Sequence, residues 1–311
     1  MHQTVTLHPN DPVDLHLHST ASDGRWTPDS LIAYLAEHGF KLVALADHDT
    51  MHNVPAMLQR ATEAGIILIP AVEVTTRWRG RHVHLLVYGV DADAERSAAF
   101  MRVLRLQQDQ LRTTAERMLE LLVSHGRFVP SLNDVSMGFP LTPHRVFTAM
   151  IRDGHGGSLF AAHNIIRGMG EPVIVDVPLE DAVAAASEAG AVSIVAHPGR
   201  DDGDGFLREA ELDSMLEEIP IDGIEAHYRS YKDADTDHYR RWAERRGLLV
   251  SSGSDSHWPS HPVNPIPHPA RWSADLLRRL GVDVNAWEGP AWLPTPAEAE
   301  SEESTAASAV S

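Results

Sequence analysis

Two histidines separated by one residue begin the stretch of this sequence that is richest in candidate chemistry. From Val13 to Gly24 the chain reads as a short apolar strand that ends at His16 and His18 and then turns through small polar residues. Side chains two positions apart in a strand lie on the same face, about 6–7 Å apart at Cα, so both imidazoles could reach one metal ion. Asp23, in the turn, could add a carboxylate. The alternative is a histidine pair that decorates an edge strand.

Further side chains of metal-binding type stand near the ends of later apolar segments. The segments 41–46, 66–74, 81–90, 191–196, 223–226 and 248–252 read as buried strands, and most are separated by helical patterns. Such alternation predicts a parallel sheet whose functional site lies at the carboxyl ends of its strands. The polar residues near those ends are His48, Asp49, Glu73, His84, His197, His227, Asp255 and His257. Histidines scattered over a surface would not recur at the same end of successive strands, so the sequence predicts a metal site.

Two regions depart from the alternation of strands and helices. Residues 93–170 read as helices without strong strands, which predicts a helical insertion into a barrel formed by residues 11–92 and 171–293. We expect the insertion to roof the site and select the leaving group; the alternative is a flap that mediates dimerisation. Residues 294–311, rich in Ala, Glu and Ser, are predicted to be a disordered acidic tail.

Composition narrows the class of protein. No apolar run is long enough to span a membrane, the first residues do not resemble a signal peptide, and there is no Cys, so we expect a cytoplasmic protein. The formal net charge of −18 argues against binding of duplex nucleic acid. It is compatible with small phosphorylated substrates, because bound divalent cations can reverse the local potential.

The strand-end groups resemble those of the polymerase-and-histidinol-phosphatase (PHP) family of metal-dependent phosphoesterases. The resemblance runs from about Pro12 to His257, outside the helical segment. It implies an α/β fold, a distorted (β/α)₇ barrel. The His-x-His opening, the Ser-Asp-Gly turn and the helical insertion after the fourth strand are most similar to the branch that hydrolyses nucleotide phosphates with a trinuclear metal centre.

The resemblance also implies which residues hold metal. A first ion would be bound by His16, His18, Glu73 and Asp255; Glu73 would bridge to a second ion, bound by His84 and His197; Asp23, His48 and His257 would bind a third. Mixed imidazole and carboxylate donors suit Mn²⁺, Fe²⁺ or Zn²⁺ better than Ca²⁺ or Mg²⁺. The resemblance favours manganese.

The implied activity is hydrolysis of nucleotide phosphates by water activated between metal ions. The absence of Cys, of a Gly-x-Ser-x-Gly elbow and of a Walker-type loop agrees with it. The expected substrate is a nucleoside monophosphate such as AMP, or a 3′,5′-bisphosphate, with trimming of short oligonucleotides from the 5′ end. The alternatives are a histidinol-phosphate phosphatase, a C–N hydrolase on a similar barrel, and a non-catalytic metal-binding module.

Other polar residues have two interpretations each. Asp49 could protonate the leaving group or orient a ligand, or it could cap the next turn. Arg200 could pair with phosphate as a guanidinium fork, or be a solvated loop residue. His227 could contact phosphate or donate a proton, whereas Glu225 is expected to be structural. Histidines expected to lie on the surface, at helix ends or too near a strand start are His82, His125, His144, His155, His163, His238, His261 and His268.

Overall fold

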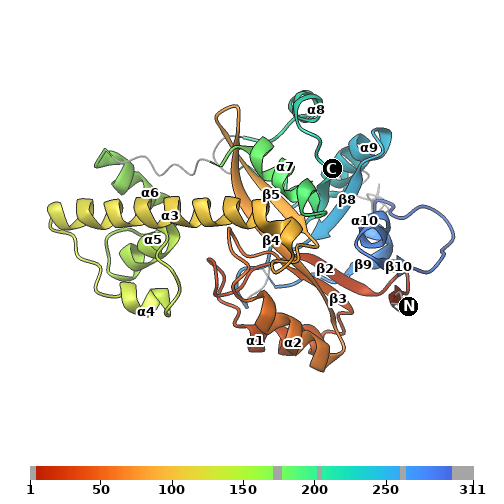
Figure 1. The fold of residues 1–311 in the computed structure, drawn as a ribbon, viewed down its shortest axis with the longest axis horizontal. Coiled ribbons are helices and arrows are strands. Elements are labelled where there is room, and N and C mark those ends of the chain that lie inside the picture. Colours follow the sequence, from red (N-terminus) through yellow and green to blue (C-terminus); the bar gives the residue numbers. More distant parts are fainter. Residues whose placement is uncertain (1–4, 171–176, 202–204, 260–263, 296–311) are drawn as a thin grey trace, which may run out of the picture.

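A nearly closed sheet forms the centre of the molecule. The computed structural model describes residues 5–170, 177–201, 205–259 and 264–295, and within them the main sheet has eight strands in the order β8-β7-β6-β5-β4-β3-β2-β9 (Figure 1). The two ends approach each other, because Leu17 bridges to Ser256 and the backbone N–H of His18 donates to Ser256 O at 3.0 Å. The predicted α/β class and distorted barrel are confirmed. The strands are β2 (Pro12–Leu17), β3 (Leu42–Leu45), β4 (Ile67–Trp78), β5 (Arg81–Tyr88), β6 (Val192–Val195), β7 (Gly223–Tyr228), β8 (Leu249–Gly253) and β9 (His268–Pro269).

Apolar residues on both faces of the strands explain why the sheet is covered by helices. In β3, Leu42 and Ala44 belong to one buried cluster, whereas Val43 and Leu45 belong to another on the opposite face. A strand that is buried on both faces reads as a continuous apolar run, as this one does. The helices outside the insertion are α1 (Pro28–Glu37), α2 (Val54–Ala64), α7 (Leu179–Glu188), α8 (Glu209–Glu218), α9 (Asp233–Arg245) and α10 (Ala274–Arg279), with a short 3₁₀ turn η2 (Ala270–Ser273).

The sheet is not wholly parallel, which corrects one expectation from the strand and helix pattern. Strand β5 runs antiparallel to both β4 and β6. The cause is a two-residue hairpin at Arg79 and Gly80, whose φ angles of 48° and 83° are both positive, as a type I′ turn requires. Because β4 continues to Trp78, Glu73 lies in the interior of its strand and not at its far end.

The helices of residues 93–170 form an arm that projects from the barrel (Figure 1). They are η1 (Glu95–Ser97), α3 (Ala98–Ser124), α4 (Leu132–Ser136), α5 (Pro143–Arg152) and α6 (Leu159–Gly168). The start of α3 packs on the barrel through Phe100 and Leu104, whereas its end shares a separate small core with α5 and α6. One long helix therefore joins the arm rigidly to the barrel. The domain boundaries stay predictions.

A second, smaller sheet joins the N-terminal strand to a segment late in the chain. Strand β1 (Val5–Leu7) pairs in parallel with β10 (Val282–Val284) in a two-stranded sheet. Of the tail predicted to be disordered, only residues 294 and 295 are described, so the prediction for 296–311 falls outside the described residues.

Candidate metal centre

The two histidines of the His-x-His opening are buried at the end of β2 and contact acidic residues that follow or lie in other strands. His16 and His18 both have 0% exposure. His16 Nε2 lies 3.0 Å from Glu73 Oε2, and His18 Nε2 lies 3.1 Å from both Glu73 Oε2 and Asp255 Oδ1. The pair therefore faces into the barrel mouth and does not decorate an edge.

Glu73 is the residue on which the cluster converges. Its Oε2 lies 3.4 Å from His48 Nδ1, while its Oε1 lies 3.1 Å from His84 Nδ1 and 3.0 Å from His197 Nε2. Burial alone would raise the pKa of Glu73, but the surrounding imidazoles, His16 first, hold that pKa well below its ordinary value. A fully buried carboxylate that stays charged needs cationic partners. Imidazoles or metal ions can both supply them.

The nine predicted ligands come together in overlapping groups. Potential ligand atoms lie within 4.8 Å of one another in three sets, which are His16, His18, Glu73 and Asp255; His18, Asp23, His48 and His257; and His48, Glu73 and His84. His197 Nε2 adjoins the third set, 3.3 Å from His84 Nδ1. Only Glu73 was expected to be shared between two ions, but His18 and His48 also lie in two sets each. The structure thus brings all nine residues together, and their roles as ligands stay predictions.

Several buried atoms of this cluster fit metal ions better than they fit one another. Among the described residues, His18 Nδ1 and Nε2, His48 Nδ1 and Asp255 Oδ1 are buried yet have no hydrogen-bond partner in suitable geometry. Buried polar atoms normally have hydrogen-bond partners, and coordination of an ion is one of the recognised explanations for exceptions. The donor set, imidazole nitrogens and carboxylate oxygens, is also one that transition metals accept.

Backbone strain marks the same place. Among the described residues, the non-glycine residues with positive φ are Asp49, Arg79, Met137, His197 and Asp255, so three of these five are site residues. Such conformations cost about 1–3 kcal/mol each and persist where the surrounding structure holds a side chain in a required direction. His197 and Asp255 follow β6 and β8, and the strained backbone turns both side chains toward Glu73 and His18.

Glu225 is a site residue that was expected to be merely structural. Its Oε1 lies 3.0 Å from His16 Nδ1, and its Oε2 accepts a hydrogen bond of 2.9 Å from the backbone N–H of His197. Gly253 allows this close packing, because a Cβ there would lie 2.3 Å from His16 Cβ and 2.7 Å from Glu225 Oε1. Such a carboxylate fixes the ring orientation and basicity of a ligating histidine.

His227 is not brought to the cluster. A register shift in β7 between Glu225 and His227 places the two side chains on opposite sides of the strand. His227 Nε2 lies 2.7 Å from Arg240 Nη1, and the ring stacks on Trp272 with centroids 4.4 Å apart. In this position His227 does not face the predicted ligands, so the structure does not support the expected contact with phosphate. His268, expected at the surface, is buried nearby, with its ring 6.4 Å from that of His227.

Asp49 and Arg200 both lie beside the cluster. Asp49 accepts hydrogen bonds of 2.8 Å from both Thr75 N and Thr75 Oγ1, and burial raises its pKa to about 6. Both carboxylate oxygens of Asp49 therefore bind β4 at Thr75, two residues from Glu73. Arg200 Nη1 donates to Asp255 Oδ2 at 2.8 Å. Arg229, which the sequence did not single out, also lies near Asp255 Oδ2, at 3.5 Å.

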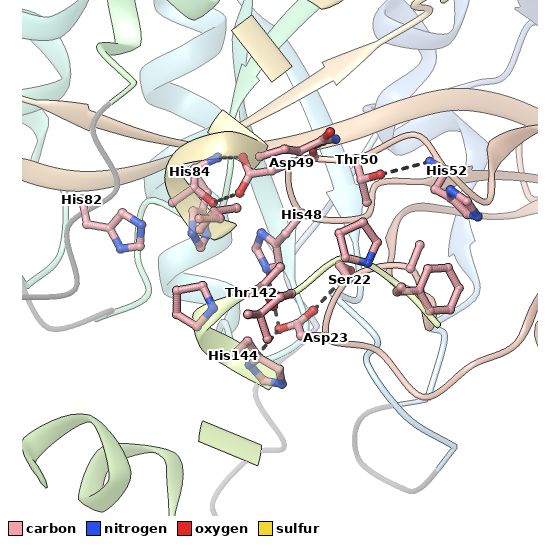
Figure 2. Close-up of a pocket in the computed structure, with 18 residues that line it drawn as sticks. Ser22, Asp23, His48, Asp49, Thr50, His52, His82, His84, Thr142 and His144 are labelled. Carbon is pink, nitrogen blue, oxygen red and sulfur yellow. Dashed lines mark hydrogen bonds and ion pairs between the residues drawn. The ribbon is translucent and has the colours of Figure 1, made fainter. Parts of the chain in front are cut away.

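A cavity of about 360 Å³ opens beside the cluster (Figure 2). Its barrel wall includes Asp23, His48, Asp49 and His84, and its other wall comes from the helical arm. The arm contributes an apolar surface formed by Leu111, Phe139, Pro140, Leu141 and Pro143, together with Thr142 and His144. The arm of residues 93–170, mainly through α3, the start of α5 and the loop before α5, thus forms one wall of the cavity. His82 also lines it.

Among the described histidines that were not expected at the site, His144 also lies beside a predicted ligand. Its Nδ1 is 3.9 Å from Asp23 Oδ2, although a helix-end or surface role was expected. No motif identified it, because only the docking of the arm brings it there. His155 and His163 instead contact Phe128 and Phe147 within the arm. His261 lies outside the described residues.

Comparisons with known proteins agree with this geometry. The PHP domain model matches residues 14–125. A 3′,5′-nucleoside bisphosphate phosphatase from Chromobacterium violaceum is 31% identical over 268 residues, covering 82% of this chain and 90% of that protein. A 5′-3′ exoribonuclease from Haemophilus influenzae is 28% identical over 256 residues, covering 79% and 90%.

Solved structures show the same fold. An amidohydrolase from Chromobacterium violaceum, determined with bound sulfate and no metal, is 27% identical with a TM-score of 0.70, covering 86% of this chain and 96% of that one. A Bifidobacterium adolescentis protein classed as a metal-dependent phosphoesterase is 22% identical with a TM-score of 0.73, covering 88% and 97%. None of the helices within the described residues combines the length and the apolar character that a membrane span requires. The chain belongs to the PHP family of metal-dependent phosphoesterases.

Proposed function

We propose that this protein hydrolyses phosphate esters of nucleotides, with a nucleoside monophosphate such as AMP or a nucleoside 3′,5′-bisphosphate as substrate. The observation that carries the proposal is the junction of the carboxylate and imidazole cluster with a cavity whose far wall is apolar. A phosphate held at the cluster would leave its organic group in the cavity. There Phe139 and Leu141 offer apolar surface to a nucleoside. The name of the Chromobacterium violaceum relative supports the same substrate class.

The proposal includes three divalent ions as cofactor, with Mn²⁺ as the first candidate and Fe²⁺ or Zn²⁺ as the others. The residues that would hold them are the eight of the three sets together with His197, which lies beside them. Ions bound there would lower the pKa of water and polarise the phosphoryl group. Metal dependence follows from membership of the family and is not part of the proposal. The number and the identity of the ions are proposed.

The protein's own residues would orient the substrate and the ligands. Arg200 lies at the Asp255 end of the cluster and presents a guanidinium that can donate to phosphate oxygens. Glu225 would hold the ring of His16 in one orientation. We propose that Asp49, whose carboxylate is engaged by Thr75, fixes β4 and does not transfer a proton.

Trimming of short oligonucleotides is a second candidate activity. It is supported by the Haemophilus influenzae relative, named a 5′-3′ exoribonuclease, which aligns with 79% of this chain. The attack geometry at phosphorus is shared with phosphomonoester hydrolysis. Because the formal net charge is −18, we propose short single strands and not duplex nucleic acid as substrates.

The test is phosphate release by purified protein, either stripped with a chelator or reloaded with Mn²⁺, Fe²⁺ or Zn²⁺. The panel comprises AMP, adenosine 3′,5′-bisphosphate, a short oligoribonucleotide with a 5′ phosphate, histidinol phosphate and a set of amides. We expect rapid turnover of at least one nucleotide by reloaded protein and none by stripped protein. Preference for histidinol phosphate or for an amide would replace the proposal with that alternative. Inactivity on every compound would favour a non-catalytic metal-binding module.

A further inference from the structure

The helical arm places one imidazole beside Asp23, at one end of the cluster of predicted ligands. His144 is the second residue of α5, and its side chain is 35% exposed toward the cavity. Figure 2 shows it beside Asp23, with Thr142 next to it on the same wall. The 3.9 Å between His144 Nδ1 and Asp23 Oδ2 exceeds the length of a hydrogen bond. The imidazole is therefore near the cluster without being tied to it.

The position of His144 is fixed by its neighbours in sequence. Thr142 caps α5, and its side chain accepts from the backbone N–H of Arg145 at 3.4 Å. The Arg145 side chain is 3% exposed and donates, at 3.1 Å each, to Thr20 O and Ala21 O in the turn that carries Asp23. It also donates to Pro140 O at 3.1 Å, within the arm. The buried guanidinium thus locks the arm to the Asp23 turn, and His144 is held between them.

Basic side chains lie at two different ends of the cluster. Arg200 is at the Asp255 end and lines a small separate pocket with His84 and His197. His144 is at the Asp23 end and lines the large cavity. If Arg200 holds the phosphate, the ester bond directs the leaving group into the large cavity. The leaving group then passes His144.

We propose that His144 is a substrate-positioning residue that hydrogen-bonds an oxygen of the sugar in the leaving group, and so selects nucleotides over phosphate esters without a sugar. This inference rests on the proposed function. It assigns specificity to a side chain from the arm that no strand-end motif contains. The arm would then contribute a directed polar contact in addition to its apolar wall.

The experiment compares wild type, His144→Ala, His144→Gln and the control His125→Ala. His125 is exposed at the end of α3 in the same arm, and its ring Nδ1 contacts Leu121 O and Ser124 Oγ in its own helical turn. The substrates are AMP and phenyl phosphate, which has no sugar. Calorimetric binding of a phosphonate analogue of AMP supplies a readout that does not depend on turnover.

We expect His144→Ala to lower kcat/KM for AMP roughly ten-fold or more, as for a lost hydrogen bond, with a change of about two-fold or less for phenyl phosphate. His144→Gln, which keeps an N–H donor, should recover part of the loss, and bound metal should be unchanged. Equal losses on both substrates, or an AMP value equal to that of His125→Ala, would overturn the inference.

The binding measurement separates this inference from the proposed function. If wild type binds the analogue but hydrolyses neither ester, the proposed function fails, while weaker binding by His144→Ala still supports the positioning role. Unchanged binding by His144→Ala would refute that role. Absence of binding by wild type would overturn both.

Discussion

Glu73 and His197 are 124 positions apart in sequence, yet Glu73 Oε1 lies 3.0 Å from His197 Nε2. Glu73 is in the interior of β4, and His197 follows the end of β6. The antiparallel strand β5 lies between them and contributes His84, whose Nδ1 is 3.1 Å from the same Glu73 oxygen. Three strands of mixed direction thus meet at one carboxylate. The other oxygen of Glu73 reaches His16 and His18.

Replacement of that carboxylate tests whether it connects separate metal sites. Glu73→Gln keeps the size of the side chain but removes its charge, so a bridge between two ions should be lost. We expect kcat to fall roughly 100-fold or more, and bound metal to fall by at least one ion per chain. The measurements are phosphate release and elemental analysis of the same preparation.

The control for this change is Glu188→Gln, at an exposed position near the end of α7. It should keep wild-type activity and metal content. Circular dichroism should show that both variants are folded. Full activity of Glu73→Gln, in a folded protein, would mean that Glu73 does not bridge metals.

Glu225 should act through His16 and not on the substrate. Glu225→Gln weakens the interaction that fixes the His16 ring at 3.0 Å and reduces the basicity of that ring. We expect the affinity for metal to fall roughly 10–100-fold, with activity regained at high metal concentration. Metal titrations followed by activity would check this. A loss of activity that excess metal does not restore would assign Glu225 another role.

The sequence was sufficient to predict where most of the proposed ligands lie in the fold, because their positions follow from rules for single strands. His16 and His18 face one way by the two-residue period of a strand, and Asp255 follows a buried apolar run. Parallel strands then bring such ends to one edge. The local pattern and the neighbouring strands agree at these positions, so the prediction needed no knowledge of packing.

The residues that the sequence misjudged depend on features that one strand does not encode. A regular strand would place Glu225 and His227, two positions apart, on the same face, but the register shift between them leaves only Glu225 facing the cluster. A bulge of this kind leaves no clear mark in the alternation of apolar residues. His144 reaches Asp23 only because Arg145 holds the arm against the barrel. Tertiary docking of this kind is invisible to periodicity.

Arg200 is expected to contribute to substrate binding. Its guanidinium lies at the edge of the cluster, 2.8 Å from Asp255 Oδ2, and is partly exposed to an incoming anion. Arg200→Ala should raise KM for AMP roughly ten-fold with a smaller change in kcat, if the contact is equally strong in the ground and transition states. Steady-state kinetics on metal-loaded enzyme would decide. An unchanged KM would remove Arg200 from the phosphate site.

His268 should make stability depend on pH through a group remote from the predicted ligands. Burial lowers the pKa of His268 from 6.5 to about 4, and the side chain is packed near His227 and Trp272. The unfolded chain therefore binds a proton between these pH values while the folded protein does not, so the free energy of unfolding falls as pH decreases from about 6.5 to about 4. The full contribution of this group is roughly 3 kcal/mol, and it is present above the unfolded pKa.

Urea denaturation of wild type and His268→Gln, both with a chelator present, would isolate this contribution. The chelator removes metal binding as a second source of pH dependence, and the other titrating groups are common to both proteins. Because glutamine does not titrate, the variant should lose less stability than wild type between pH 7.5 and pH 4. Near pH 7.5 and above, where the histidine is neutral in both states, the difference between the two proteins should not change with pH. Parallel losses of stability over the whole range would show that His268 can be protonated without cost in the folded protein.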